Sequence, residues 1–269
     1  MEKVPLVSVI IPTYNRRNLL EEAIKSVLAE DFSDYEIIVV DDGSNDGTEE
    51  YVKSIFLPKS GQVDLQLRFF ETKNKGAAAA RNFGIKEARG EYLAFLDADD
   101  LWARDFLSTA MNYLKSHQDT FVVYADQQIG VNYVTETRSR FQKNPPQNKF
   151  TVPFFIDNSP IQISSAVIRK KVIEDVGGFN ESLRIHEDVE LWNRISEKYE
   201  FGYIEKVLGL YRLRSDNISG LTNNKQFVSE ARKYLQIYLD RRKDRQLTEE
   251  EKMGFATAEE FINNIESQL

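Results

Sequence analysis

Three short segments of the sequence carry polar or acidic side chains directly after an apolar run. Ligands of open α/β sheets bind outside the carboxyl ends of the strands, so residues that follow strands can share one site. Carboxylates, a hydroxyl, an amide and an aromatic ring are all available there. The three segments are Pro12-Thr13-Tyr14-Asn15, Asp41-Asp42-Gly43-Ser44 and Asp97-Ala98-Asp99-Asp100.

Asp97 and Asp99 are two residues apart where the chain leaves a predicted strand, and the alternation of strand side chains would point both to one side. Two carboxylates in one crevice repel each other unless a cation lies between them. Mg²⁺ and Mn²⁺ bind such oxygens together with substrate phosphates. The pattern indicates a site for a divalent metal and a diphosphate. A solvated turn, in which Asp is common, is the alternative.

The other two segments offer groups that could bind a nucleoside. Asp41 or Asp42 could accept hydrogen bonds from a base or a ribose, while Ser44 or Asp46 could cap the helix that follows. Thr13 and Tyr14 supply a hydroxyl and a ring for stacking on a base. The alternative for this pair is a loop beside a tyrosine of the core.

Asn74-Lys75-Gly76 precedes an alanine-rich predicted helix that carries Arg81 and Asn82. Arg81 lies about one turn into this helix, where its guanidinium fork could reach a phosphate. An exposed helical arginine is the alternative. The sequence has neither G-x-G-x-x-G after a strand nor G-x-x-x-x-G-K-[ST], which weighs against dinucleotide enzymes and P-loop NTPases.

In the second half, Gly177-Gly178-Phe179 is followed by a predicted helix that begins near His186. Adjacent helix positions do not share a face, so at most one of Glu187 and Asp188 would reach a site. Acidic residues in a first turn also complement the helix dipole. His186 is interpreted as structural rather than as a ligand.

The elements that must position these residues alternate between strand and helix. Such alternation predicts right-handed βαβ units around a mainly parallel sheet. The predicted strands of the first half are Val7–Ile11, Tyr35–Val40, Leu65–Phe70, Tyr92–Leu96 and Phe121–Ala125. The predicted helices between them are Leu19–Leu28, Asp46–Phe56, Gly76–Ala88 and Leu101–Leu114.

After Ala125 the pattern loosens. The proline-bearing stretch Arg138–Phe155 is interpreted as a loop or lid. Further predictions are strands at Gln162–Ile168, Phe201–Ile204 and Val207–Leu213, a helix at Glu187–Glu197, and charged helices from Asn224 on with Tyr234, Ile237 and Tyr238 on one face.

Composition excludes several classes of protein. The 269 residues include no Cys and only two His, which excludes a disulfide scaffold and cysteine-based zinc sites. The net charge of −8 argues against binding nucleic acid. No apolar run approaches the roughly 20 residues of a membrane-spanning helix, and the first residues lack a signal-peptide pattern. We therefore expect a cytoplasmic protein, and peripheral contact with the inner face of the membrane is compatible with this.

Taken in order, the motifs resemble those of family 2 inverting glycosyltransferases of the GT-A fold. Those motifs are the three strand-end segments, Asn74-Lys75-Gly76 with Arg81-Asn82, Gly177-Gly178-Phe179, and Glu187-Asp188 with Leu191-Trp192. The likeness covers about residues 5–215. It implies an α/β, Rossmann-like nucleotide-diphospho-sugar transferase domain over 1–223, with a nucleotide-binding half to about 125 and an acceptor half from about 126. Residues 224–269 would form a helical extension.

The resemblance also implies roles for individual residues. Thr13, Tyr14 and Asp41 would hold the base and ribose, Arg81 would face the nucleotide or diphosphate, and Asp97 would lie near the ribose. Asp99, with Asp97, would bind Mn²⁺ or Mg²⁺, and Asp188, beside Glu187, would be the general base. The full expected donor-binding set is Pro12, Thr13, Tyr14, Asn15, Asp41, Asp42, Arg81, Asp97, Ala98 and Arg214; the acceptor set is Gly177, Gly178, Phe179 and Trp192.

One position departs from the family pattern. Members often carry a metal-binding His after a Tyr-Arg pair, and here Arg214 follows Tyr211-Arg212-Leu213. An arginine cannot ligate a metal but can pair with a diphosphate. We therefore expect weaker metal binding than the family pattern implies.

The resulting hypothesis is an enzyme that transfers a sugar with inversion from a nucleotide-diphosphate-sugar, expected to be a UDP-sugar, to a hydroxyl of a glycan or lipid-linked acceptor. Cell-surface polysaccharide synthesis would be its setting. An inactive nucleotide-sugar- or glycan-binding relative is one alternative. A sugar nucleotidyltransferase is another, although it would need a Gly-rich basic loop where Pro12-Thr13-Tyr14-Asn15 stands. The C-terminal helices present a solvated face, or they mediate a homodimer or dock a membrane-bound enzyme.

Overall fold

The computed structural model describes residues 4–56, 67–130, 161–213 and 225–269. Over these residues an eight-stranded sheet runs in the order β3-β2-β1-β4-β7-β6-β8-β5. The strands are β1 (Val7–Thr13), β2 (Tyr35–Asp41), β3 (Leu67–Glu71), β4 (Tyr92–Phe95), β5 (Leu101–Trp102), β6 (Val122–Gly130), β7 (Ala166–Arg169) and β8 (Phe201–Arg212).

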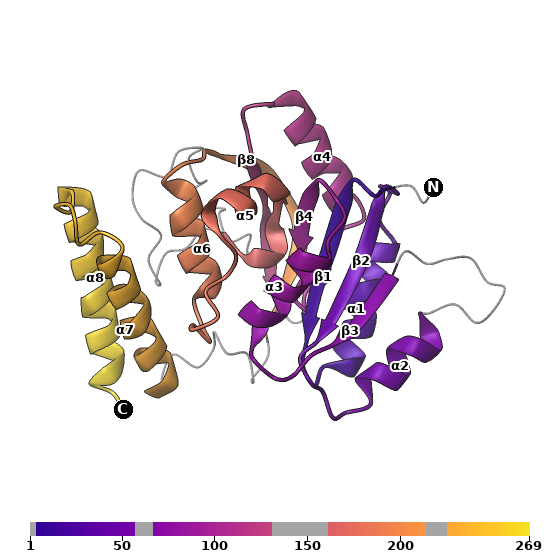
Figure 1. The fold of residues 1–269 in the computed structure, drawn as a ribbon, viewed down its shortest axis with the longest axis horizontal. Coiled ribbons are helices and arrows are strands. Elements are labelled where there is room, and N and C mark those ends of the chain that lie inside the picture. The colour runs from indigo at the N-terminus through magenta and orange to yellow at the C-terminus, as the bar shows by residue number, and fades with distance from the viewer. Residues whose placement is uncertain (1–3, 57–66, 131–160, 214–224) are drawn as a thin grey trace.

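Helices cover both faces of this sheet (Figure 1). They are α1 (Arg17–Leu28), α2 (Thr48–Ile55), α3 (Ala77–Glu87), α4 (Phe106–Ser116), α5 (Lys170–Val176), α6 (Glu187–Ser196), α7 (Lys225–Asp240) and α8 (Glu249–Glu266), with a 3₁₀ turn η1 (Ile163–Ser165). The predicted loop or lid at Arg138–Phe155 lies outside the described residues, as does Arg214.

The first half of the sheet is parallel, as the alternation of strands and helices predicted. β1 pairs in parallel with β2 and β4, and β2 with β3. The second half is mixed, because β7 is antiparallel to both β4 and β6, and β5 is antiparallel to β8. The sheet is therefore less uniformly parallel than predicted.

Several boundaries differ from the predictions, and three of these differences change the type or the number of elements. Leu101 begins a two-residue edge strand instead of a helix, and Trp102 Nε1 donates to the Ser164 carbonyl (2.7 Å). The helix follows at Phe106. The two late strands are one strand, β8, whose register against β6 shifts beside Asp126. The predicted strand from Gln162 begins as η1, and only its second half, β7, pairs in the sheet.

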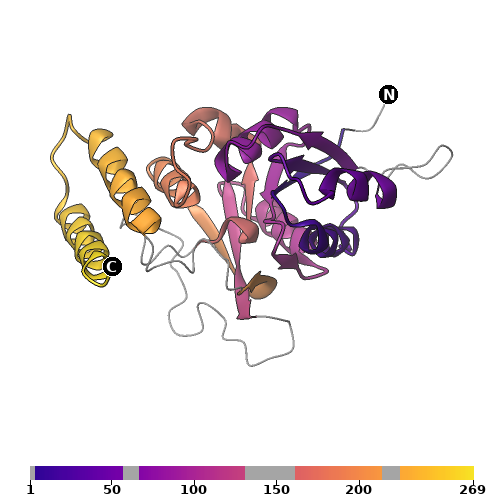
Figure 2. The same cartoon turned by 90° about the horizontal axis from the view of Figure 1, so that it is seen from below.

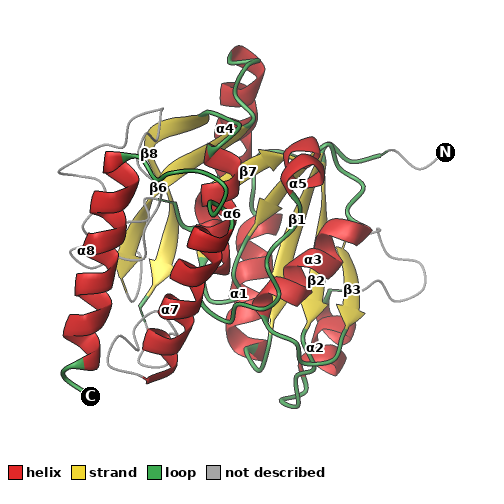
Figure 3. Ribbon diagram, turned by 60° about the vertical axis from the view of Figure 1, so that its left-hand side comes forward, coloured by secondary structure: helices red, strands yellow, loops and turns green. Residues whose placement is uncertain are grey.

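Alternating side chains of the strands fill two apolar layers. Val9 and Ile11 of β1 pack on one face with the buried residues of α1 and α4. Ile10, between them, packs on the other face with residues of α3, α5 and α6. Figure 3 shows α1 and α3 on opposite sides of the sheet. Every residue of β1 is buried, as expected for a central strand covered on both faces.

The C-terminal helices α7 and α8 lie side by side next to α6, at the end of the molecule opposite β3 (Figure 2). Tyr234 and Tyr238 are buried in the same core layer as α6, and Ile237 packs against it, so the predicted common face of these three residues is confirmed. Within the described ranges, no helix has the length and apolar character needed to cross a membrane.

Candidate active site

The ends of β1, β2 and β4 meet at one edge of the sheet, which we call the strand-end edge. Thr13 and Asp41 are register partners at the last pair of β1 and β2. The backbone N–H of Asp42 donates to the Thr13 carbonyl (2.8 Å), and that of Leu96 donates to the Ile10 carbonyl (3.0 Å). The polar segments that follow these strands therefore lie together, as the topology of an open α/β sheet requires.

Asp41 ties the loops after β1 and β2 together. Its buried carboxylate accepts hydrogen bonds from the Ser44 backbone N–H (2.9 Å) and hydroxyl (2.6 Å). The Ser44 hydroxyl oxygen accepts the Asn15 N–H (2.8 Å), and the Asn15 side chain accepts the Asn45 N–H (2.8 Å). Burial raises the pKa of Asp41, partly offset by these bonds from Ser44. Of the two expected caps of α2, only Asp46 accepts an N–H of that helix, from Thr48 (3.2 Å).

Asp42 faces the loop before α3 instead of the loop after β1. Its carboxylate accepts the backbone N–H groups of Lys75 (2.9 Å) and Gly76 (2.7 Å). These two bonds fix the start of α3, on which Arg81 lies. The Asp42 carboxylate is thus occupied by backbone N–H groups, whereas the Asp41 carboxylate lies beside the predicted nucleoside-binding residues.

Beside Asp41, the last residue of β1 and the residue after it present one buried and one exposed group. Thr13 is buried, and its hydroxyl has no hydrogen-bond partner among the described residues. Pro12 before it is buried as well. Tyr14 is 45% exposed, so its ring is available for stacking on a planar ligand.

Arg81 connects the two halves of the chain at the strand-end edge. The residue is only 3% exposed, and the two terminal nitrogens of its side chain donate to Asp97 Oδ1 and Glu187 Oε1, both at 2.6 Å. Burial opposes the charge, but the two carboxylates outweigh it and raise the pKa of Arg81. Its Nε has no partner among the described residues. The exposed-arginine alternative is therefore wrong.

The segment Asp97–Asp100 forms a tight turn rather than a continuation of β4. The Asp100 N–H donates to the Asp97 carbonyl (3.0 Å), and the Asp97 N–H donates to the Ser164 hydroxyl oxygen (3.0 Å). The alternation of strand side chains therefore does not apply, and the reason given for placing Asp97 and Asp99 on one side is corrected. Both are partly exposed and close enough to raise the pKa of buried Asp100, after the larger effect of burial. Ala98 between them is buried.

The carboxylates of Asp97 and Asp99 can hold a divalent cation only together with oxygens of a bound ligand or water. No group of three or more His, Cys, Asp or Glu side chains suited to a metal occurs in the part of the chain that the structure describes. One oxygen of Asp97 already accepts from Arg81. The donor set of Asp99 and Asp97 therefore fits Mn²⁺ or Mg²⁺ bound mainly through diphosphate oxygens and water, as is usual for Mg²⁺.

Asp188 lies in the first turn of α6, directly after Glu187. Glu187 is turned toward Arg81, and Asp188 is partly exposed, with Oδ1 accepting the N–H of Val189 (2.8 Å). Burial, and then the charge of Glu187, raise the pKa of Asp188 to about 7. A carboxyl group with this pKa is suited to take up a proton near neutral pH. The two neighbours thus have different environments, as the helical geometry predicted.

Gly177-Gly178-Phe179 forms a turn that other side chains hold from both sides. Arg194 donates to the carbonyls of Val176 (2.8 Å), Gly177 (2.9 Å) and Gly178 (2.6 Å). Asn82 accepts the Phe179 N–H (2.8 Å) and donates to its carbonyl (2.9 Å). Asn82 and Arg194 had no predicted role of their own, although Asn82 belongs to the Arg81-Asn82 motif and Arg194 to the predicted helix Glu187–Glu197.

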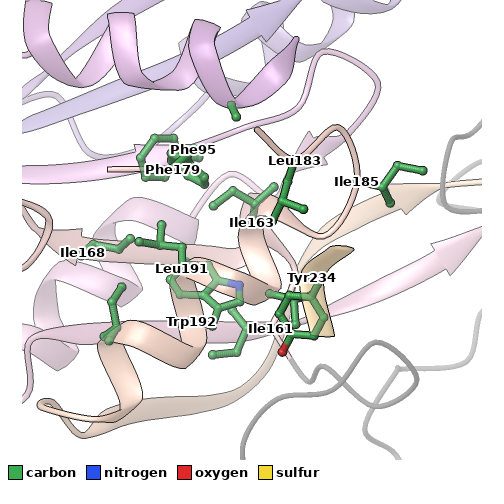
Figure 4. Close-up of a cluster of buried hydrophobic side chains, with 14 of the residues drawn as sticks. Phe95, Ile161, Ile163, Ile168, Phe179, Leu183, Ile185, Leu191, Trp192 and Tyr234 are labelled. Atoms are coloured by element: carbon green, nitrogen blue, oxygen red, sulfur yellow. The ribbon is translucent and has the colours of Figure 1, made fainter. Parts of the chain in front are cut away.

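Two of the predicted acceptor-binding residues belong to the core. Phe179 is 4% exposed and packs edge-on against Phe95, with ring centroids 5.3 Å apart, beneath the guanidinium of Arg81 (5.4 Å). Trp192 has no exposed surface and packs near Phe201. Figure 4 shows both among apolar side chains. Neither can contact an acceptor in this structure, so these two predictions are corrected; Gly177 and Gly178 reach the surface.

Comparison with known sequences gives consistent matches. The model of the family "Glycosyl transferase family 2" matches residues 8–177. An uncharacterized glycosyltransferase of Rickettsia felis is 35% identical over 224 residues, which make up 82% of this chain and 35% of that protein. The chain thus spans about a third of that relative. The putative teichuronic acid biosynthesis glycosyltransferase TuaG of Bacillus subtilis is 29% identical over 219 residues, 80% of this chain and 82% of that protein.

Two solved structures share the fold. S. aureus TarS 1-349 in complex with UDP-GlcNAc has a TM-score of 0.68 at 21% identity, covering 98% of this chain and 72% of that chain. The mannosyltransferase PcManGT of Pyrobaculum calidifontis, in complex with GDP-Man and Mn²⁺, also has a TM-score of 0.68 at 21% identity, covering 97% of this chain and 70% of that chain.

Proposed function

Because the chain belongs to glycosyl transferase family 2, we propose that it moves a sugar from a nucleotide-diphosphate-sugar to a hydroxyl group of a glycan or lipid-linked acceptor. The family and the GT-A fold class predicted from the sequence are confirmed. The observation that carries the proposal is the double ion pair of Arg81, which brings Asp97 of the strand-end edge beside the Glu187–Asp188 pair. This arrangement supports a reaction in which the proposed donor site and the proposed proton acceptor are neighbours.

In the proposed reaction, Asp188 takes the proton of the acceptor hydroxyl. The oxygen then forms a bond to the anomeric carbon as the bond from that carbon to the diphosphate breaks, and the diphosphate leaves with the electron pair. Direct displacement on the face opposite the leaving group inverts the configuration. No covalent bond between sugar and protein is needed.

The remaining residues bind and orient the donor in this proposal. Tyr14 and Thr13 receive the base, and Asp41 the ribose. Asp99 and Asp97 would hold Mn²⁺ or Mg²⁺, and such an ion would supply positive charge to the leaving diphosphate. Arg81 is a buried cation at the strand-end edge and holds Asp97 and Glu187 in place. The expected donor is a UDP-sugar; a neighbour in the fold comparison binds UDP-GlcNAc, and another binds GDP-Man.

Synthesis of a cell-surface polysaccharide is the proposed setting, supported by the name of the relative TuaG. The first experiment titrates UDP and GDP into the protein by calorimetry, with Mn²⁺ and again with EDTA. We expect one nucleotide to bind with Mn²⁺ and to lose at least tenfold in affinity with EDTA. Binding that ignores EDTA would remove the metal from the proposal.

The second experiment tests transfer and the role of Asp188. The protein is incubated with nucleotide sugars and glycan acceptors, and the anomeric configuration of the product is read by NMR. Asp188→Asn should lower kcat by about 10²–10⁴-fold, the range for loss of a general base. Nucleotide binding without transfer to any acceptor would favour the inactive-relative alternative, and full activity of Asp188→Asn would remove this residue from the mechanism.

A further inference from the structure

Helix α7 lies against the segment Ser182–His186, which leads directly into Glu187 and Asp188. The Arg184 backbone N–H donates to Glu230 Oε2 (2.7 Å), and Lys233 Nζ donates to the Ser182 carbonyl. Both partners are on α7, which runs beside α6 in Figure 3. The C-terminal extension therefore touches the chain immediately before the candidate base.

His186 connects this segment to α6. Its φ is 68°, the left-handed region that non-glycine residues seldom adopt, and its carbonyl accepts the Glu190 N–H (3.0 Å) in the first turn. The ring is 9% exposed and lies edge-on to Phe227 of α7, with centroids 5.1 Å apart. A backbone in such a region persists only when its surroundings hold it. Phe227 is one of the residues that surround His186.

Helix α7 also contacts α6 beyond the candidate base. Asn193 Nδ2 donates to the hydroxyl of Tyr234 on α7 (2.6 Å), and Arg241, the residue directly after α7, lies 3.5 Å from the carboxylate of Glu190. Contacts on α7 thus fall both before and after Asp188 along the chain. Together they limit translation and rotation of the first turn of α6.

We propose that α7 is a positioning element for the transfer reaction: through Phe227, Glu230 and Lys233 it holds Ser182–His186 and thereby fixes where the carboxyl group of Asp188 points. This inference rests on the proposed function. A displacement of about 1 Å in a reacting group can cost about 10²-fold in rate, so loss of these contacts should act on kcat. The donor site is made by other elements and should be unaffected.

The test compares two double variants of the 269-residue chain. Glu230→Ala/Lys233→Ala removes the two polar contacts with Ser182–His186. Arg232→Ala/Gln236→Ala removes two polar side chains from the same helix whose contacts go to Asn263 and Glu266 of α8 and to Asp240 of α7. Each is compared with the unmodified chain by kcat, donor KM, nucleotide affinity and hydrogen–deuterium exchange of residues 182–190.

We expect the first variant to exchange faster over residues 182–190 and to lose about tenfold or more in kcat, with donor KM and nucleotide affinity within twofold. The second variant should match the unmodified chain in every measurement. The inference is overturned if the first variant keeps its kcat, if its exchange is unchanged, or if nucleotide affinity falls together with kcat, which would indicate general loosening. Failure of the proposed function is distinct, because the unmodified chain would then transfer no sugar.

Discussion

Replacing Asp188 by Asn should make the protein more stable while it removes the proposed base. The folded structure raises the pKa of this carboxyl from 3.8 to about 7, chiefly by burial. The folded state therefore binds the proton more tightly than the unfolded chain does. Between these two pKa values folding takes up a proton, so stability falls as the pH rises through this window. Above pH 7 the folded state bears the full cost of holding this carboxyl group in its charged form.

The size of this cost follows from the two pKa values. Each tenfold change in proton affinity is worth about 1.4 kcal/mol, so the rise corresponds to at most about 4 kcal/mol at pH 8. Asp188 interacts electrostatically with Glu187 and Arg81, and its partial exposure to solvent reduces the cost of its charge. We therefore expect Asp188→Asn to raise the free energy of unfolding at pH 8 by about 2–4 kcal/mol. The side-chain oxygen of the substituted asparagine can still accept the Val189 N–H, so the substitution removes charge with little change in shape.

The assay is urea unfolding, followed by circular dichroism, of both proteins at pH 8 and pH 5 with EDTA and without nucleotide. Asp188→Asn should be the more stable protein at pH 8, and the difference should shrink by at least half at pH 5. Asp175→Asn is the matched control: hydrogen bonds from Lys198 and Tyr199 lower the pKa of Asp175, so its substitution should not stabilise. Equal stability of Asp188→Asn and the unmodified protein at pH 8, or a gain independent of pH, would refute the reasoning.

Three further outcomes are expected. Trp192→Phe should leave the acceptor KM unchanged, since the ring has no exposed surface; a raised KM at unchanged stability would restore its predicted role. Gly178→Ala should lower the free energy of unfolding in urea by about 1–3 kcal/mol, because the added Cβ would overlap Asn82 Oδ1. In an Asn82→Ala background most of this loss should disappear. Several interactions, of which the hydrogen bonds from Arg245 are the strongest, lower the pKa of Glu251 below 4.5. Helix α8 should therefore lose stability as the pH falls below that value. Hydrogen exchange of α8 at pH 7 and pH 3.5 should show this loss in the unmodified chain and not in Glu251→Gln.

The parallel half of the sheet was predictable because its strands are apolar runs that are buried on both faces. Such runs can be predicted to form buried strands from the local sequence alone. β5 and β7 were not predictable in the same way. β5 has two residues, and the antiparallel direction of β7 is set by its neighbours β4 and β6 and by no local pattern.

The candidate site was predictable where a topological rule applies and less so where side chains from distant segments meet. The strand-end residues follow from the sheet topology alone. Helical spacing placed Arg81 near the site but could not show that it is buried, because its partner Glu187 is 106 residues away. The family resemblance placed Trp192 in the acceptor set, yet this residue of α6 points into the core and is fully buried.

The double ion pair of Arg81 also bears on the order in which the chain folds during synthesis. Residues 1–100 emerge from the ribosome first and contain β1 to β4, α3 and Asp97, so Arg81 can find its first partner early. Glu187 is made about a hundred residues later, and the pairing of β7 with β4 must wait as long. Contacts this distant in sequence form slowly. Nascent chains halted before α6 should therefore contain β1 to β4 and α3 with an Arg81 that still lacks one of its two carboxylate partners, a species that chaperones would meet on the ribosome.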